Sequence, residues 1–396
     1  MIRASKRYVT YWKRRDRTYG DRKMKLVFAS DTFKGTLTSE KISELLIKAA
    51  GEVIGRCETV PVVLADGGEG TLDAILNARE GRKIPIMVHD PLLKEIEAYY
   101  GAFDDEAVIE MAQASGLTVV PEDLRNPLQT SSFGTGELIR AALLAGYRKI
   151  TVAIGGSATN DGGMGAAVAL GIRFKDTDGN DLQGCGNDLA KIRDIDMTGL
   201  LPEIKDARIR VMCDVKNPLC GENGATYVYG PQKGASVEAL KVLEKGMLNY
   251  REVLKRNFGI DPDTIEGAGA AGGMGAALKI FLGAELRSGI ESILDIVRFD
   301  ELIEGANVVI TGEGRLDAQS SAGKAVQGVA ERAKRAGIPC IALCGSTGEG
   351  YESILEHGVT KVVTLSGSDI SAEYAMEHAE EVYYQRALEV MREMAE

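Results

Sequence analysis

The stretch from Ile150 to Leu170, ITVAIGGSATNDGGMGAAVAL, contains residue types that could bind a phosphate and carry out chemistry on it. Its first five residues are apolar or β-branched and predict a buried strand, and its Ala- and Gly-rich end has helical spacing. Glycines between them allow positive φ angles, so backbone N–H groups can point at a phosphate beside a helix N-terminus. These glycines are Gly155, Gly156, Gly162 and Gly163.

Asp161 lies inside the same loop. A carboxylate among donors directed at a phosphate would repel that phosphate unless the carboxylate binds a metal ion or takes a proton. Its presence therefore favours chemistry over simple binding. The alternative is a structural turn in which Asp161 caps the helix that follows.

Two acidic turns near the ends of the chain are almost identical in sequence. GEGTLDA (68–74) and GEGRLDA (312–318) differ at one position, and each follows a predicted strand, at 58–65 and 307–310. Carboxylates close to backbone donors could hold Mg²⁺ beside a nucleotide phosphate. The similarity suggests that both turns face one site, although chance similarity of two glycine turns is the alternative. The acidic residues here are Asp66, Glu69, Glu313 and Asp317.

Further polar residues follow the predicted strands 24–30 and 208–214. Asp31 and Lys34 come directly after the first of these strands, and Asp214 ends the second. Ligands of open α/β sheets bind at the carboxyl ends of the strands. The alternative for Asp31 and Lys34 is a turn-stabilising carboxylate and a solvated amine. The three histidines, His89, His357 and His378, lie outside the glycine loops and are predicted to be surface or packing residues. Any general base is therefore predicted to be a carboxylate.

Two segments resemble nucleotide-binding motifs but do not meet the requirements of those motifs. Gly267-x-Gly269-x-x-Gly272 lacks the preceding strand that a dinucleotide fingerprint needs, and residues 320–324 lack the residues of a P-loop. The sequence GGMGAA occurs at 162–167 and again at 272–277. We interpret this repeat as small residues that let a helix start pack closely on a neighbour.

Composition excludes several classes of protein. The 396 residues carry a net charge of −11, which argues against nucleic acid or an anionic membrane surface as the main partner. No apolar run reaches the roughly 20 residues of a membrane span. The six cysteines include no CxxC pair, so neither a zinc site nor a disulfide framework is indicated, and a reducing cytoplasm fits best.

The first 23 residues differ from the rest of the chain. They hold nine Lys and Arg against two Asp and show no apolar face; without them the chain has 38 basic and 56 acidic residues, a net charge of −18. A predicted strand begins at Met24. We therefore expect residues 1–23 to be a disordered extension or an artefact of the assigned start, with Met24 as the native first residue.

The order of predicted elements indicates an α/β protein of two domains. Strands at 24–30 and 58–65 alternate with helical segments, whereas short alternating runs after Arg82 suggest meandering strands. The Gly- and Asp-rich span 175–196 is predicted to be surface loop. Other predicted elements are helices at 71–78, 236–257 and 371–394, a helix that opens within 130–136 and runs to 144, and strands at 339–343 and 361–365.

From Met24 onward the sequence resembles the bacterial type I glycerate kinases. The resemblance covers residues 24–394 and rests on eight blocks in family order: SDTFKG (30–35), ADGGEGT (65–71), TSSFGTGELI (130–139), IGGSATNDGG (154–163), CDVKNPL (213–219), GPQKGA (230–235), GAGAAGGMGAA (267–277) and TGEGRLDAQS (311–320). One departure is Val326, where the family usually has proline, a change that concerns the backbone next to Lys324.

This resemblance implies two α/β domains with the active site in the cleft between them. One domain, Rossmann- or flavodoxin-like, is built from residues 24–82 and 287–396, and the other, restriction-endonuclease-like, is inserted as residues 83–286. The implied reaction is phosphoryl transfer from ATP, with Mg²⁺, to a hydroxyl of D-glycerate. 2-Phosphoglycerate is the favoured product, although the residues alone do not distinguish O2 from O3. The oligomeric state is not defined, and a homodimer is one option.

On this basis we expect Asp161 to be the general base, with Asp66 as the second candidate. Lys34, Arg315 and Lys324 are expected to bind phosphate or the glycerate carboxylate, and Arg315 suits a bidentate contact. The expected magnesium ligands are Asp66, Glu69, Glu313 and Asp317. The remaining expected substrate- or phosphate-binding residues are Asp31, Gly67, Gly68, Gly155, Gly156, Ser157, Asn160 and Asp214.

Three other functions compete with this prediction. A kinase for another small hydroxy acid would share the same loops. A dehydrogenase would need a sound dinucleotide fingerprint, which the region near Glu266 does not supply. A non-catalytic sensor of glycerate or nucleotide would not need so many carboxylates beside glycine loops.

Overall fold

The computed structural model describes residues 3–4, 23–33, 35–64, 67–318 and 325–396. The chain divides into two compact units, which we call the terminal unit and the inserted unit. The terminal unit is Met1–Ala65, Asn77–Arg79 and Ile293–Glu396, and the inserted unit is Asp66–Leu76 and Glu80–Ser292. The first acidic turn therefore belongs to the inserted unit, whereas the predicted domain boundary placed it in the other domain.

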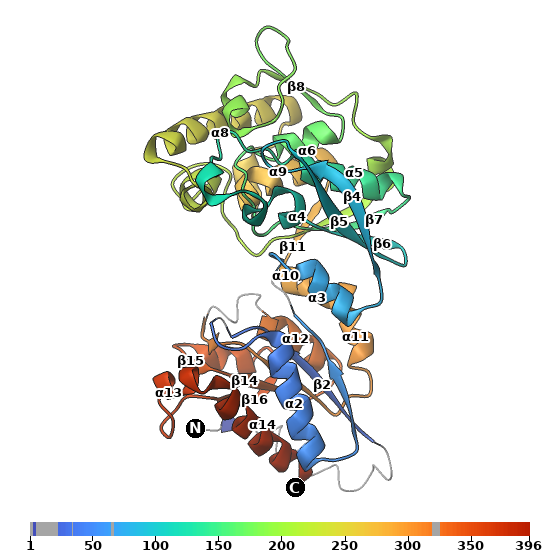
Figure 1. Cartoon of the computed structure of the whole chain (residues 1–396), viewed down its shortest axis with the longest axis vertical. Coiled ribbons are helices and arrows are strands. Elements are labelled where there is room, and N and C mark those ends of the chain that lie inside the picture. Colours follow the sequence, from blue (N-terminus) through green and yellow to red (C-terminus); the bar gives the residue numbers. More distant parts are fainter. Residues whose placement is uncertain (1–2, 5–22, 34, 65–66, 319–324) are drawn as a thin grey trace. The chain divides into compact units, whose positions relative to one another are not determined.

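A parallel sheet built from both ends of the chain forms the centre of the terminal unit (Figure 1). Apolar strands are buried here because helices cover both faces of the sheet. The strand order is β1-β16-β14-β12-β2-β3, parallel except for the edge strand β1. The strands are β1 (Arg3–Ala4), β2 (Met24–Ser30), β3 (Cys57–Pro61), β12 (Val308–Gly312), β14 (Cys340–Cys344) and β16 (Val359–Thr364).

Of the predicted N-terminal extension, the structure describes strand β1 and Lys23. Strand β1 pairs antiparallel with β16, with Arg3 opposite Val362 and Ala4 opposite Lys361. The other residues before Lys23 lie outside the described residues.

Helices α2 (Ser39–Val53) and α14 (Ala379–Ala395), from opposite ends of the chain, lie side by side on one face of this sheet (Figure 1). They share a core with alternate strand residues such as Leu26 and Val308. The N-cap of α2 is Thr38, whose side chain accepts from Lys41 N. Helix α12 (Ala325–Arg335) contacts β2, β12, β14 and β16. The remaining elements are α11 (Phe299–Leu302), β13 (Arg315–Leu316), β15 (Ser346–Thr347), a 3₁₀ helix (Tyr351–Leu355) and α13 (Ala372–Glu377).

A six-stranded mixed sheet forms the centre of the inserted unit, in the order β11-β10-β7-β6-β5-β4. Strands β6, β7, β10 and β11 are parallel, and β4 and β5 continue the sheet as an antiparallel meander. The strands are β4 (Arg82–His89), β5 (Glu95–Phe103), β6 (Glu106–Glu110), β7 (Lys149–Ala153), β10 (Arg208–Met212) and β11 (Glu285–Arg287). The meander that the sequence after Arg82 predicted is thus present.

Helices surround this sheet and bury one continuous apolar core with it. Helix α8 begins after its N-cap Ser236, whose side chain accepts from Ala239 N. The helices are α3 (Thr71–Ala78), α4 (Ala112–Ser115), α5 (Phe133–Leu144), α6 (Met164–Ala169), α7 (Ala225–Tyr229), α8 (Val237–Phe258), α9 (Ala270–Leu282) and α10 (Gly289–Ile296); α3 and α10 end in the terminal unit. Short 3₁₀ helices are Leu117–Val119, Glu122–Leu124, Pro202–Asp206, Pro231–Lys233 and Pro262–Thr264.

The prediction of a surface loop over 175–196 is wrong. Strands β8 (Arg173–Lys175) and β9 (Asp194–Asp196) pair as a hairpin, and a 3₁₀ helix covers Gly186–Lys191. Its isolated apolar residues, Leu189 and Ile192 among them, are buried in the core. Such widely spaced residues produce no helical or strand periodicity, so the polar residues between them dominated the prediction.

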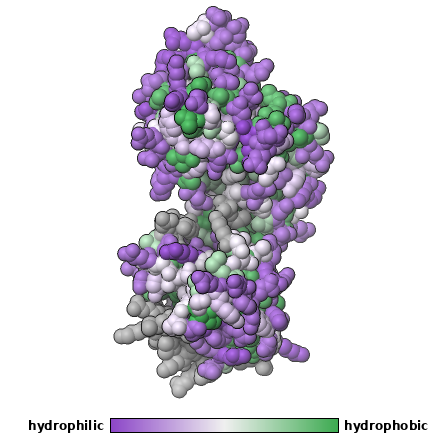
Figure 2. Space-filling view, turned by 60° about the vertical axis from the view of Figure 1, so that its left-hand side comes forward, coloured by the Kyte–Doolittle hydropathy of each residue, from purple (hydrophilic) through white to green (hydrophobic). Residues whose placement is uncertain are grey.

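Charged and polar side chains occupy most of the face seen in Figure 2, with small apolar patches between them. This distribution agrees with the charged composition of the chain. Among the described residues, no helix combines the length and the apolar character needed to cross a bilayer.

Candidate functional site

The loop that follows β7 contacts the first acidic turn inside the inserted unit. Gly155 N donates to Gly67 O over 3.0 Å. A Cβ atom on Gly155 would lie 2.6 Å from Gly68 Cα, so only glycine permits this approach. Gly156 has a φ of +72° and is exposed, and within the described residues nothing accepts a hydrogen bond from its N–H. The two glycine segments therefore form one surface with backbone donors.

Glu110 fixes the first acidic turn, and sequence reasoning missed it. It ends β6 and is buried, and its carboxylate accepts from Gly70 N over 3.1 Å and from Leu72 N over 3.0 Å. Burial raises the pKa of Glu110, and the two backbone donors oppose that shift. The carboxylate thus holds the first N–H groups of α3. A Glu at the end of an apolar run, Ala107–Ile109, was the available signal. Glu69, in the turn itself, is exposed.

The structure corrects the expected role of Asp161. Its side chain is 0% exposed, and its carboxylate accepts four hydrogen bonds, from Ser132 N, Ser132 Oγ, Gly163 N and Gly165 N, at 2.7–3.1 Å. Burial raises its pKa, and these donors oppose the shift. A general base must come within hydrogen-bond reach of the proton it removes. The geometry is instead that of a carboxylate holding the start of α6, the alternative that the sequence left open.

Asn160 is also fully buried, so it does not offer its side chain to a ligand in this conformation. Its Nδ2 donates to Thr226 Oγ1 over 3.1 Å, which ties the loop to α7. The expectation that Asn160 contacts substrate is corrected accordingly. Ser157 is also buried, at 7% exposed, but it lies next to the exposed Gly156.

The two GGMGAA segments pack directly against each other. Gly162 N donates to Gly272 O over 2.9 Å, and a Cβ on Gly163 would lie 2.5 Å from Ala277 Cβ. Helix α9 is interrupted at residues 271–273, where φ is positive at all three. The repeat therefore marks a close contact between the starts of α6 and α9, as the small residues predicted. It does not mark a dinucleotide site.

A second residue missed by sequence reasoning is Lys233. It ends the 3₁₀ turn Pro231–Lys233, where a Cβ on the next residue, Gly234, would lie 2.3 Å from Arg125 O. Its Nζ donates to Ser157 Oγ over 2.8 Å and to Thr159 O over 2.6 Å. Burial lowers the pKa of Lys233 to about 7, and the charge of Asp161 opposes that shift. The block GPQKGA (230–235) contains this lysine, but nothing in the local sequence showed that the side chain is buried.

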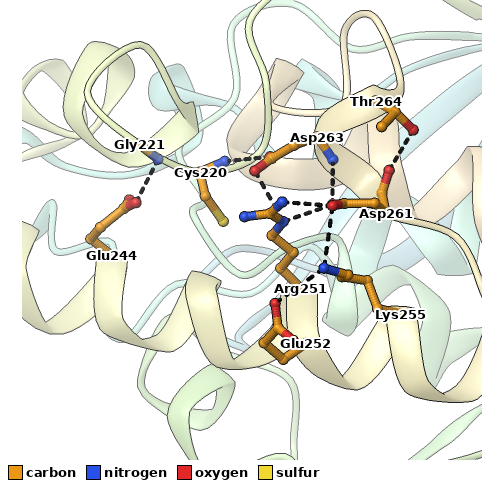
Figure 3. A network of polar contacts seen from close by, with 9 residues as sticks. All are labelled: Cys220, Gly221, Glu244, Arg251, Glu252, Lys255, Asp261, Asp263 and Thr264. Atoms are coloured by element: carbon orange, nitrogen blue, oxygen red, sulfur yellow. Dashed lines mark hydrogen bonds and ion pairs between the residues drawn. The ribbon is translucent and has the colours of Figure 1, made fainter.

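Figure 3 shows the polar network that fixes the segment between β10 and α7. Arg251 of α8 contacts both Asp261 and Asp263, at 2.6 Å and 3.1 Å. Asp263 in turn accepts from Cys220 N, and Glu244 accepts from Gly221 N. The network holds the chain ahead of α7, and α7 carries the Thr226 that binds Asn160. Its members are Cys220, Gly221, Glu244, Arg251, Glu252, Lys255, Asp261, Asp263 and Thr264.

The second acidic turn belongs to the terminal unit and has a different structure from the first. Residues after β12 form the short strand β13, paired with β15, whereas the first turn leads into helix α3. Arg315 Nε lies 3.8 Å from an Asp317 carboxylate oxygen, and the Arg315 side chain is 70% exposed. Glu313 is buried, and its backbone oxygen accepts from Gly345 N. Similar sequence has therefore produced two unlike turns, because the surrounding strands differ.

Two further expected site residues occupy strand ends. Asp31 N donates to Gly312 O over 2.9 Å, and the Asp31 carboxylate accepts from Thr32 N. Asp31 and Glu313 thus follow adjacent strands, β2 and β12, of the terminal unit. Asp214 Oδ1 accepts from Ser288 Oγ and Gly289 N, so it caps α10. Asp214 is exposed, and its expected contact with substrate stays a prediction.

Three expected residues, Lys34, Asp66 and Lys324, lie outside the described residues. Across the ranges that the structure does describe, no group of three or more His, Cys, Asp or Glu side chains is arranged to hold a metal ion. Magnesium needs fewer protein ligands than that, because it is usually bound by one or two carboxylates together with substrate phosphates. The carboxylate oxygens of the two acidic turns are the type of ligand that Mg²⁺ prefers.

The histidines are engaged in other contacts. His89 Nδ1 lies 3.1 Å from Glu137, His357 Nδ1 lies 2.8 Å from Glu331, and His378 stacks on Tyr374. These partners agree with the surface or packing roles that the sequence predicted.

The fold and its glycine loops define an α/β protein with a backbone surface suited to anions. The model of the glycerate kinase family matches residues 26–395, and the chain belongs to that family. A glycerate kinase from Halalkalibacterium halodurans is 43% identical over 364 residues, 91% of this chain and 96% of its own length. A glycerate 2-kinase from Escherichia coli K12 is 45% identical over 344 residues, 86% of this chain and 90% of its own length.

A crystal structure from Salmonella typhimurium LT2, provisionally named glycerate kinase 2, has the same architecture. It superposes with a TM-score of 0.79 at 40% identity and covers 94% of this chain and 99% of its own. Family membership and fold therefore agree across nearly the whole chain.

Proposed function

We propose that the protein transfers the γ-phosphoryl group of ATP to a hydroxyl of D-glycerate, with 2-phosphoglycerate as the favoured product. The observation that carries the proposal is the contact between the Gly67–Gly70 turn and the Gly155–Gly156 loop, in a chain of the glycerate kinase family. Successive backbone N–H groups at positive φ can bind phosphate or carboxylate oxygens. The glycerate 2-kinase among the relatives supports the choice of product.

Phosphoryl transfer requires in-line positioning and neutralisation of the phosphate charge. We assign the general base to Asp66, because Asp161 is buried and already bonded. The base takes the hydroxyl proton as the new P–O bond forms and the bond to ADP breaks. Lys34, Arg315 and Lys324 are proposed to bind phosphate or the glycerate carboxylate, and Asp31, Gly67, Gly68, Gly155, Gly156 and Ser157 to orient the substrates.

We propose Glu69 in the inserted unit, and Glu313 and Asp317 in the terminal unit, as candidate ligands of Mg²⁺, with Asp66 as an alternative ligand. When bound, the ion offsets the negative charge of the ATP phosphates. The six cysteines are free thiols, which supports our proposal of a reducing cytoplasm. Homodimer formation stays a prediction.

We also infer the fold class of each of the two units. Without β1, the strands of the terminal unit lie in the chain order 2-1-3-4-5, which is the flavodoxin-like order. A Rossmann- or flavodoxin-like class is supported by that order. The restriction-endonuclease-like class of the inserted unit stays a proposal that its mixed sheet allows.

The deciding experiment is a coupled assay of ADP release with D-glycerate, followed by identification of the product by NMR. We expect ADP release that depends on both D-glycerate and Mg²⁺, with the phosphate on O2. Phosphate on O3 would correct the regiochemistry only. A much higher kcat/KM with tartronate or hydroxypyruvate would favour a kinase for another hydroxy acid. Binding of both substrates without ADP release would favour a sensor.

A further inference from the structure

Lys233 is a buried lysine that the proposed reaction does not use. Its side chain is 2% exposed, and its Nζ reaches a side chain and a carbonyl of the loop after β7, Ser157 Oγ and Thr159 O. These hydrogen bonds join positions 76 and 74 residues apart in the chain. Lys233 therefore fixes the geometry of the glycine loop from beneath its exposed surface.

Stability alone does not explain a lysine at this place. Burying an ammonium group costs free energy that hydrogen bonds to two neutral oxygens offset only in part. Asp161 is the charged group that acts on Lys233, and it already accepts four other hydrogen bonds. An apolar side chain of similar volume would fill the same space at lower cost. Buried titratable groups of this kind concentrate at functional sites.

The hydrogen bond to Ser157 determines where the proton of its hydroxyl can point. A serine hydroxyl has one donor and two acceptor lone pairs. Because Lys233 donates into one lone pair, the Ser157 proton must point away from Nζ. Within the described residues, Ser157 Oγ makes only this hydrogen bond. Its proton is thus available to a group bound at the neighbouring Gly156, which is exposed.

We propose that Lys233 is a positioning residue that orients the Ser157 hydroxyl as a donor to an anionic oxygen bound at Gly155–Ser157. The inference rests on the proposed function, since the anionic oxygen belongs either to the carboxylate of D-glycerate or to a phosphate of ATP. Ser157 O–H and Gly156 N–H would donate to that oxygen together. Lys233 acts through Ser157 and does not contact the substrate.

The test compares Lys233→Met, Ser157→Ala and the double variant in steady-state kinetics against both substrates. We expect each single variant to raise the KM of one and the same substrate about ten- to hundredfold, the range for a hydrogen bond to a charged group. The double variant should show no larger effect than Ser157→Ala, because Lys233 acts only through the Ser157 hydroxyl. A higher KM for D-glycerate would identify the bound oxygen as part of its carboxylate. A higher KM for ATP would identify it as part of a phosphate.

The matched control is Lys361→Met. Lys361 is another buried lysine, 1% exposed, and its Nζ contacts Glu393 in the terminal unit. We expect this variant to lower the melting temperature and to leave both KM values within about twofold, a difference of roughly 0.4 kcal/mol. A purely structural role for Lys233 would give the same pattern as this control.

Three results would overturn the inference: an unchanged KM for both substrates in Lys233→Met, an unchanged KM in Ser157→Ala, or additive effects in the double variant. Should Lys233→Met fail to fold, Ser157→Ala and Lys233→Gln, which keeps an amide donor, decide the question. Isothermal titration with ATP and with D-glycerate separates this inference from the proposed function. A wild-type chain that binds both but does not phosphorylate would refute the function, while loss of binding in the variants would still support the inference.

Discussion

At the scale of single residues, we expect Asp161 to have a structural role and Asp66 to have a chemical one. Asp161 accepts four hydrogen bonds in a buried setting, so we expect Asp161→Asn to remove acceptors and to place an NH₂ group against backbone donors. The expected loss is about 1–3 kcal/mol in the free energy of unfolding. Urea denaturation measures this loss, and activity should fall in proportion to the folded fraction.

Asp66→Asn is the contrasting variant. We expect it to lower kcat by about 10²–10⁴, the contribution of a positioned general base, without a matching loss of stability. Parallel measurements of kcat and urea midpoint check both statements. If Asp161→Asn is fully folded with kcat reduced to that extent while Asp66→Asn is active, the assignment of the base reverts to Asp161.

The buried amine of Lys233 also predicts a dependence of stability on pH. Its pKa is about 7 in the folded chain, against an ordinary value of 10.5. Between these values the unfolded chain binds more protons at this side chain, so the free energy of unfolding rises with pH. Each unit of pKa difference corresponds to about 1.4 kcal/mol, so the rise is on the order of a few kcal/mol over the whole window.

Denaturation of wild type and Lys233→Met between pH 6 and 8, below the ordinary cysteine pKa of about 8.5, measures this effect. The curve of the wild type should rise more steeply above about pH 7, and the two slopes should agree below pH 6.5, where the lysine is charged in both states. Parallel curves across the whole range would show that Lys233 keeps an ordinary pKa.

At the scale of elements, the contact between the loop after β7 and helix α9 depends on glycine. Gly272 has a φ of +67°, and a Cβ there would lie 2.1 Å from Thr159 O. Gly283, at the end of the same helix, has a φ of +65° and no atom within 4 Å of such a Cβ. The two positions therefore have the same backbone conformation and differ in available space.

We expect Gly283→Ala to cost only the strain of the left-handed backbone, about 1–2 kcal/mol. Gly272→Ala should cost a further 1–3 kcal/mol or so, because the neighbouring backbone must move. Thermal or urea denaturation of both variants checks the difference. Equal destabilisation would mean that the loop and α9 separate easily, contrary to the packing described here.

At the scale of the whole molecule, substrates should stabilise the folded chain by mass action. A ligand present at 100 times its Kd adds about 2.7 kcal/mol to the free energy of unfolding. We therefore expect magnesium ATP and D-glycerate each to raise the melting temperature in calorimetry. Glycerol, which has the hydroxyls but no carboxylate, is the control and should cause no shift at millimolar concentrations. An equal shift with glycerol would contradict recognition of the carboxylate.

Much of the fold was predictable because the elements have strong local signals. The strand Met24–Ser30 and the helix Thr71–Ala78 have the predicted bounds, and the N-cap serine and threonine residues mark two long helices. The predicted ends of helices and strands were wrong where tertiary contacts determine them. The closing helix, for example, is divided at His378. The sheet order depends on pairings between distant segments, which no local pattern records.

The candidate site was predictable only in part. Glycine loops and their conformations follow from residue type, since only glycine tolerates positive φ with close backbone approach. Burial does not follow from the loop sequence, and burial is what distinguishes Asp161 from an exposed base and Lys233 from a solvated lysine. Both errors concern polar residues whose partners, Ser132 and Ser157, lie far away in the chain.

The terminal sheet also affects how the protein is made. Strand β2 ends at Ser30, but its neighbour β12 begins only at Val308, after the whole inserted unit. At about 5–20 residues per second, the ribosome needs on the order of tens of seconds to produce that partner. During this time one edge of an apolar strand has no native partner, and such edges promote aggregation. One edge of the early strand is thus exposed until late synthesis completes its sheet.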